Sequence, residues 1–171
     1  MSETLTQRSA DAATTQPPVA PPQSVEYLVF VTRDRKLAVP ITDVREIRSW
    51  SEPTPLPHAP PHLLGVVNLR GTVLPVIDLA LRLKIDRTPA GARNVFVVVE
   101  VDGRPIGLLV EAVADIHKSN GEDRQPVPAT AEGSVTPCIE SLLLANDAMI
   151  QILDLPALSL VADDAVERQP S

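Results

Sequence analysis

The same order of short apolar runs occurs twice along this chain of 171 residues. Residues 25–31 form a β-branched and aromatic run, and residues 95–101 form a matching run in the second half. The repetition is clearest at residues 73–79 and 149–155, where an apolar run ends in Asp-Leu. Runs of this length and composition predict β-strands. The recurrence therefore indicates a tandem duplication of two small β-units, each of about five strands.

Two such units are expected to depend on each other. A unit of roughly 60 residues buries little apolar surface alone, so the two should pack together and unfold together. Open five-stranded sheets expose their edges, and curling into barrels hides those edges. We therefore predict a mostly β fold with two tandem five-stranded barrels and short helices. The first barrel is expected at about residues 25–88 and the second at about residues 93–160.

Composition limits the classes of function. Eighteen prolines argue against a bundle of long helices, and a net charge of −7 with few aromatic residues argues against binding nucleic acid. The single cysteine, Cys138, excludes an intramolecular disulfide. No apolar run approaches the length of a membrane span, so we expect a protein that is not membrane-inserted. Residues 1–10 do not resemble a secretory signal, which makes the cytoplasm the expected compartment.

The two ends of the sequence differ from the domain between them. Residues 1–24 are rich in Ser, Thr, Gln, Ala and Pro, and residues 161–171 are acidic. Segments of this composition bury too little apolar surface to offset the entropy lost on ordering. We expect a disordered proline-rich arm before the barrels and a flexible acidic tail after them.

The histidines do not form a recognisable catalytic or metal site in the sequence. His58 and His62 have the spacing of a metal site on a helix, but Pro60 and Pro61 lie between them and interrupt a regular helix. His117 has no evident partner nearby in the sequence. We therefore expect His58 and His62 to lie in a solvated loop rather than at a metal site.

Three other residues with reactive side chains have simpler structural explanations. Cys138 lacks a Cys/His signature and is expected to be a small buried apolar residue. Asp78 and Asp154 end equivalent strands just before predicted helical turns, so N-capping explains them better than acid–base catalysis. We predict that the chain is not an enzyme and that it carries no metal and no cofactor.

The most informative segment is the predicted hairpin around residues 65–79. Arg70 and Gly71 separate two apolar strands, as the turn of a hairpin would. Strand alternation places Asn68 and Arg70 on one face of that hairpin. Solvation of a polar turn explains this pattern at its simplest, but Asn-Leu-Arg-Gly followed by an apolar strand and Asp-Leu is also a family signature.

Four further segments occur in the order that this family shows. They are Tyr27-Leu28-Val29-Phe30, Val44-Arg45-Glu46-Ile47, the Ile-Gly-Leu-Leu-Val strand of residues 106–110, and Val113-Ala114-Asp115-Ile116. Together with residues 68–79, they make the chain resemble CheW-like domains over about residues 25–160.

The resemblance implies two SH3-like five-stranded barrels and a non-enzymatic chemosensory scaffold. CheW-like adaptors join the cytoplasmic tips of methyl-accepting chemoreceptors to the regulatory domain of a CheA-type histidine kinase. Other CheW-like domains would be further partners, in rings beneath membrane-associated receptor arrays. The chain would then be cytoplasmic and recruited to those arrays. No kinase, phosphoacceptor or receiver segment is visible, which favours a free-standing adaptor.

The resemblance also carries over to individual residues. The candidates for receptor binding are Val44, Glu46, Asn68, Arg70, Val95 and Ile116. Ile41 is the candidate for kinase binding. Ordinary core packing is the alternative explanation for the four apolar residues, and a surface salt bridge is the alternative for Glu46.

One departure and two alternative functions stay open at the level of sequence. Ser141 stands where the family commonly has a glycine, which leaves the second barrel less well defined. An adaptor of a parallel pathway, such as type IV pilus or cyclic-di-GMP signalling, would show the same signature. A small β-domain hydrolase or ligand-binding protein would instead require Asp78, Asp154 or His117 to meet in one pocket.

Overall fold

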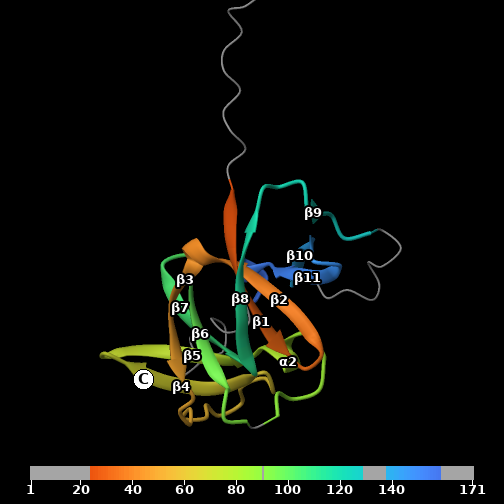
Figure 1. The fold of residues 1–171 in the computed structure, drawn as a ribbon. Coiled ribbons are helices and arrows are strands. Elements are labelled where there is room, and N and C mark those ends of the chain that lie inside the picture. The colour runs from red at the N-terminus through yellow and green to blue at the C-terminus, as the bar shows by residue number, and fades with distance from the viewer. Residues whose placement is uncertain (1–23, 90, 129–137, 159–171) are drawn as a thin grey trace, which may run out of the picture.

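A computed structural model describes residues 24–89, 91–128 and 138–158 of the chain. Residues 1–23 and 159–171, which contain almost all of the predicted arm and the whole predicted tail, lie outside these ranges. The described residues form two mixed β-sheets that pack against each other (Figure 1).

The first sheet has six strands in the order β8-β1-β2-β11-β10-β9. These strands are β1 (Val25–Thr32), β2 (Arg35–Pro40), β8 (Ala112–Ser119), β9 (Arg124–Gln125), β10 (Ile139–Ala145) and β11 (Ala148–Leu153). All neighbouring strands are antiparallel except β2 and β11, which are parallel.

The second sheet has five strands in the order β3-β6-β7-β5-β4. These strands are β3 (Val44–Ser49), β4 (Leu63–Leu69), β5 (Thr72–Asp78), β6 (Val95–Val101) and β7 (Arg104–Val110). A 3-10 turn, η1 (Ile41–Asp43), precedes β3, and the short helix α2 (Leu79–Arg82) follows β5. Residues 155–158 form a second helical turn after β11.

Each sheet is assembled from both halves of the sequence. Strands β1 and β2 of the first half pair with β8 and β11 of the second half, and β5 of the first half pairs with β7 of the second. The ranges 25–88 and 93–160, given above for the two barrels, therefore stay a prediction of where the two sequence repeats begin and end. The hydrogen-bonded sheets cross the boundary between these ranges.

Both sheets curl so that their outer strands approach each other. In the five-stranded sheet, Thr54 lies five residues after β3 and pairs with Val66 on the free edge of β4, through hydrogen bonds of 2.8 and 2.9 Å. In the six-stranded sheet, the outer strands β8 and β9 are consecutive in the chain and are joined by a short turn. The Thr54 bridge covers part of the free edge of β4, and the short turn holds the outer strands of the other sheet near each other, in the direction that the predicted barrels would require.

Strand alternation sends apolar side chains to opposite faces of each sheet. In β1, Leu28 and Phe30 enter a large cluster shared by the two sheets, whereas Tyr27 and Val29 enter a smaller cluster inside the six-stranded sheet. In β6, residues 97 and 99 enter the shared cluster, and Phe96 enters a cluster inside the five-stranded sheet. The largest apolar core therefore lies between the sheets.

The repeat is visible in atomic detail. The amide of Asp78 donates to the carbonyl of His62 and the amide of Asp154 donates to the carbonyl of Cys138, both at 2.7 Å. The two hairpins turn through equivalent pairs of residues with positive φ, Arg70-Gly71 in the first and Asn146-Asp147 in the second. Equivalent residues thus occupy equivalent places in the two sheets.

The structure confirms the predicted mostly β fold with two sheets and short helices. It adds strand β9, which was not among the predicted strands, so the first sheet has six strands rather than five. A proline within a strand is usually found on an edge strand or at a bulge, because it lacks an amide hydrogen, and Pro75 is such a case. It lies in β5, where the strand pairs with β4 but its pairing with β7 has not yet begun, so its missing amide hydrogen costs no ladder bond on that side.

Only glycine fits at position 65, because the backbone of Thr54 approaches it closely. Its φ is +144°, and an added Cβ would lie 2.1 Å from the carbonyl oxygen of Thr54. Gly71 also has a positive φ, but a Cβ there would meet nothing within 4 Å. We expect Gly65→Ala to destabilise the fold by about 3 kcal/mol or more, against about 1–2 kcal/mol for Gly71→Ala. Urea denaturation measures both, and equal losses would contradict the steric argument.

The interleaved sheets predict that neither half folds alone. Fragments 1–91 and 92–171 each lack strands that the other supplies to its sheets. We expect each fragment to be unfolded by circular dichroism, and the mixture to regain the β spectrum of the intact chain. A cooperative unfolding transition in either isolated fragment would contradict this expectation.

Candidate functional site

The hairpin between β4 and β5 turns through two residues in the left-handed region. Arg70 has a φ of 52° and Gly71 a φ of 85°, which is the pattern of a type I′ turn. The side-chain oxygen of Asn68 accepts a hydrogen bond of 2.8 Å from the amide of Gly71. Asn68 therefore stabilises the turn, and Arg70 extends from the tip of the hairpin with 72% of its side chain exposed.

An ion pair joins this hairpin to β3. The Arg70 guanidinium donates to Oε2 of Glu46 at 2.7 Å, and the Arg48 guanidinium donates to Oε1 of the same carboxylate at 3.2 Å. Hydrogen bonds from Arg70 and then from Arg48 hold the pKa of Glu46 below its usual value. One carboxylate is thus shared between two arginines, and the group carries a net positive charge.

The position of this ion pair in the sheet gives it a structural effect. Strand β3 is the first strand of the five-stranded sheet and β4 is the last. The two strands share no ladder, so the contact between Glu46 and Arg70 bridges two edges that the backbone leaves unpaired. It complements the bridge between Val66 on β4 and Thr54, which lies in the segment after β3.

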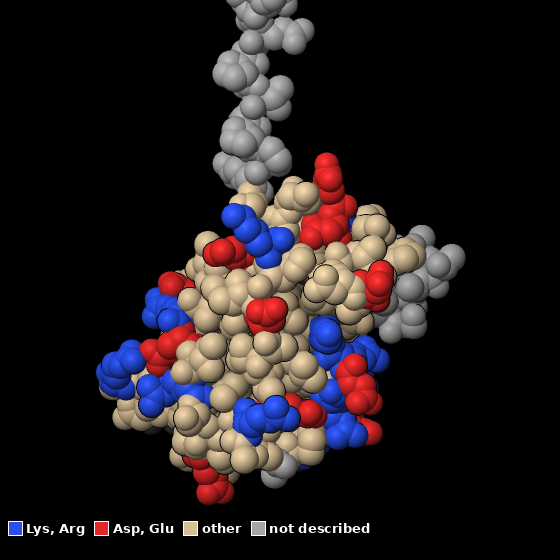
Figure 2. Space-filling view, viewed as in Figure 1, with Lys and Arg blue, Asp and Glu red and all other residues tan. Residues whose placement is uncertain are grey.

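Further charges surround the pair on β3. Arg45 sits at a bulge in the pairing of β3 with β6 and donates to Glu100 at 2.7 Å. That hydrogen bond lowers the pKa of the Glu100 carboxyl. On the face shown in Figure 2, acidic and basic side chains alternate rather than gather into one large patch of either sign. That pattern is unlike the continuous basic surface that nucleic acids require.

The apolar candidates are more dispersed than the charged ones. Val44 and Val95 are half-buried and pack against the shared core. They lie toward opposite ends of the ladder between β3 and β6, where Val44 pairs with Val99 and Val95 pairs with Ser49. Ile116 lies on β8 of the other sheet and is 50% exposed. Ile41 lies in η1 and is half-buried.

The structure therefore brings together Glu46 and Arg70, with Asn68 beneath the turn that carries Arg70. Val44 lies on β3 with Glu46, two residues before it, whereas Val95, Ile116 and Ile41 lie on other elements. The assigned binding roles of all seven stay predictions. Sequence reasoning missed Arg48 as the second partner of Glu46. A signal was present, because residues two apart on a strand share a face.

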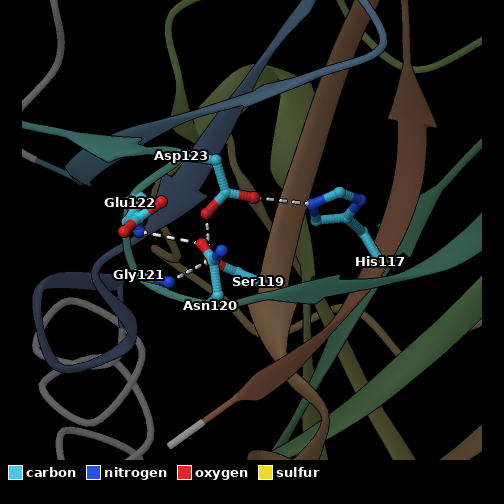
Figure 3. Close-up of polar contacts among 6 residues, drawn as sticks. All are labelled: His117, Ser119, Asn120, Gly121, Glu122 and Asp123. Carbon is cyan, nitrogen blue, oxygen red and sulfur yellow. Dashed lines mark hydrogen bonds and ion pairs between the residues drawn. The ribbon is translucent and has the colours of Figure 1, made fainter. Parts of the chain in front are cut away.

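A polar cluster closes the six-stranded sheet at the turn between β8 and β9. Figure 3 shows Asp123 between two side chains of β8: one carboxylate oxygen accepts from the hydroxyl of Ser119, and the other lies 3.0 Å from Nε2 of His117. The Ser119 oxygen in turn accepts from the amide of Gly121 at 3.1 Å. His117 thus has a partner six residues away, which the sequence analysis did not identify.

This cluster contains Ser, His and Asp but not in a catalytic order. In a hydrolytic triad the histidine contacts the serine and the aspartate orients the histidine. Here the aspartate lies between the other two, and the serine proton is donated to the aspartate. The cluster fixes the turn that joins the outer strands of the sheet.

The two repeat-related aspartates cap helical turns. Oδ1 of Asp78 accepts from the amides of Ala80 and Leu81, which confirms the predicted N-cap. Its two oxygens also accept from the hydroxyl and the amide of Thr88. Asp154 accepts from the amide of Ala157 in the equivalent turn. Among the described residues, Asp78, Asp154 and His117 each bond to other partners and not to one another, so the structure does not support the hydrolase alternative, which required them to meet.

The remaining reactive side chains do not form a catalytic or metal site among the described residues. Cys138 is fully buried in the shared core, as predicted, and burial raises the pKa of its thiol. His62 was expected in a solvated loop but is half-buried, and this burial, with the nearby Arg82, lowers the pKa of its imidazole. Within the described ranges, no group of three or more His, Cys, Asp or Glu side chains is arranged to hold a metal ion.

Ser141 fits the second hairpin by a different arrangement from Gly65 in the first. Both residues follow a register shift in their strands. The backbone of Thr54 crowds Gly65, whereas the Ser141 hydroxyl accepts a hydrogen bond of 2.9 Å from the side chain of Arg124 on β9. Ser141 fits where the family commonly has a glycine, because its contact with β9 is made by the side chain of Arg124 rather than by a closely approaching backbone.

Comparison with known sequences places the chain among close relatives. The family described as CheW-like domain matches residues 26–161. The chain is 40% identical over 130 residues to "Chemotaxis protein CheW" of Rhizobium meliloti, which covers 76% of this chain and 84% of the relative. It is 41% identical over 133 residues to "Probable chemotaxis protein CheW" of Rhizobium etli, with 78% of this chain and 86% of the relative covered.

A solved structure shares the fold. The crystal structure of the scaffolding protein TtCheW from Thermoanaerobacter tengcongensis superposes with a TM-score of 0.72 at 26% sequence identity. The match covers 83% of this chain and 88% of that one. Among the described residues of this chain, no helix is long and apolar enough to cross a bilayer.

The shared carboxylate predicts how Glu46 titrates. Arg70→Asn removes one guanidinium while keeping a residue that accepts positive φ, so the hairpin should form and the pKa of Glu46 should rise toward its usual value. In the wild type, the ion pair's contribution is present at neutral pH and is lost as the pH falls through the lowered pKa of Glu46.

Carboxyl-detected NMR titration measures this shift. Glu100 serves as an internal control, because its partner Arg45 is unchanged in the variant. An unchanged pKa for Glu46 would show that Arg70 does not hold the carboxylate in solution.

Proposed function

Since the chain belongs to the family of CheW-like domains, we propose that it couples the cytoplasmic tips of methyl-accepting chemoreceptors to the regulatory domain of a CheA-type histidine kinase. The family consists of non-enzymatic scaffold proteins, and the chain is a chemotaxis scaffold rather than an enzyme. We place its action in the cytoplasm, at membrane-associated receptor arrays.

The exposed Arg70 at the hairpin tip is the observation that most supports a binding surface here. A left-handed φ costs an L-residue about 1–2 kcal/mol, and Asn or Gly would satisfy this turn with less strain. Arginine at this position is therefore not explained by the turn itself. Its side chain is exposed and oriented by Glu46, which suits contact with a partner.

The candidate receptor surface combines a net positive charge with apolar side chains. The shared carboxylate leaves one positive charge in excess over Glu46, Arg48 and Arg70, which would favour an acidic group on the receptor tip. Val44 on the same strand as Glu46, Val95 on β6 and Ile116 on β8 would supply apolar contacts. Ile41 in η1 would serve the kinase, and exposed strand edges would pair with other CheW-like domains in rings.

Such a scaffold acts by binding its partners rather than by catalysing a reaction. Holding the receptor and the kinase together raises their effective concentration, since the second binding event becomes intramolecular. A receptor whose states differ in affinity for the complex then shifts the populations of kinase states. Neither step consumes a substrate.

Receptor binding tests the role of Arg70. We expect Arg70→Asn to weaken binding to a receptor cytoplasmic fragment about tenfold, or about 1.4 kcal/mol, with the fold unchanged. Glu140→Gln is a matched control, because it breaks the exposed ion pair between Glu140 and Arg124 on the other sheet. Surface plasmon resonance gives the affinities. Wild-type affinity in Arg70→Asn, or an equal loss in the control, would rule out this assignment.

A charge exchange separates recognition from hairpin support. The double variant Glu46→Arg with Arg70→Glu keeps an ion pair across the two sheet edges but reverses its direction. If the pair only supports the hairpin, the exchange should restore receptor binding relative to the single variants. If Arg70 itself meets the receptor, binding stays weak.

A further inference from the structure

A cavity of about 310 Å³ opens beside Trp50 at one end of the five-stranded sheet. Trp50 directly follows β3, Asn94 directly precedes β6, and Asp78 ends β5. The strands of this sheet therefore begin or end around the cavity. Mouths of small β-barrels are common places for ligand sites. We refer to this space as the Trp50 cavity.

The walls of the Trp50 cavity are aromatic and aliphatic. Leu64 and Leu109 line it together with Trp50. The ring of Trp50 lies 5.3 Å from that of Phe96, at a tilted angle of 56°, and Phe96 belongs to the buried cluster inside the sheet. Trp50 nevertheless keeps 47% of its surface exposed. A planar apolar group can therefore lie against one aromatic wall without disturbing the core.

Two hydrogen-bond donors at the cavity have no partner among the described residues. Arg87 lines the cavity, is exposed, and forms no hydrogen bond or ion pair with any residue that the structure describes. The indole N–H of Trp50 likewise has no hydrogen-bond partner among the described residues. The amide nitrogen of the Asn94 side chain is already used, because it donates to the carbonyl of Pro89 at 2.9 Å.

The one carboxylate at the cavity is shielded from an occupant. Asp78 is fully buried, and its two oxygens accept four hydrogen bonds, two from the first turn of α2 and two from Thr88. A carboxylate satisfied in this way offers no further acceptor to a ligand. The exposed charge at the cavity is therefore the positive charge of Arg87.

We propose that the Trp50 cavity binds a small planar aromatic carboxylate, with its ring against Trp50 and its carboxylate at Arg87. The volume is at the lower end for ligand sites, which suits one or two fused rings. A guanidinium pairs with a carboxylate through two parallel hydrogen bonds. This site is separate from the scaffold function and does not rest on it.

The intact chain carries its own reporter for this proposal. Trp50 is the single tryptophan, so a ¹H–¹⁵N spectrum contains one indole signal. Naphthalene-2-carboxylate serves as the probe. We expect a saturable shift of the indole signal, and an affinity about tenfold weaker in Arg87→Gln. Arg93→Gln is the matched control, because Arg93 is exposed in the same connecting segment but does not line the cavity.

The neutral amide of the same ring separates charge recognition from apolar contact. We expect 2-naphthamide to bind much more weakly than the carboxylate. The proposal is overturned if the indole signal shows no saturable shift up to about 1 mM carboxylate. It is also overturned if the amide binds equally well, or if Arg87→Gln and Arg93→Gln give the same affinity.

Discussion

The apolar layer between the two sheets is the interaction on which the rest of the structure depends. It receives Phe30 and Leu37 from the six-stranded sheet, Val97 and Leu108 from the five-stranded sheet, and Leu79 from α2. Burial of each such side chain contributes about 1.5–3 kcal/mol. The clusters inside each sheet are smaller. Neither sheet would therefore be stable without the other, and the surface features on both are held in place by this one layer.

The sequence predicted the individual strands better than it predicted which strands pair. Apolar alternation predicted most strands and the repeat, because strand periodicity is a property of neighbouring residues. It did not show that β5 pairs with β7 or β2 with β11, since those contacts join residues far apart in the chain. Strand β9 was missed because Arg124–Gln125 has no apolar pattern of its own. It is a strand only because β10 supplies its partners.

The candidate site was predictable as a set of residues but not as a geometry. The turn motif and the segment around Glu46 both stood out in the sequence, yet they lie on strands at opposite edges of one sheet. Their contact exists only because the sheet curls. The second partner, Arg48, and the pairing of His117 with Asp123 were missed for a related reason. Both depend on the exact path of a strand or turn, which residue types alone do not specify.

The crossing of both halves into both sheets also has a mechanical consequence. In a protein of two sequential domains, a single linker would let the two parts rotate, and partners bound to each would change their relative orientation. Here hydrogen-bonded ladders and a common core span the boundary, so no hinge is available. Proteins bound to the two sheets would be held at a fixed angle. The domain would then act as a rigid body. It would fix the positions of its partners relative to each other without changing its own shape.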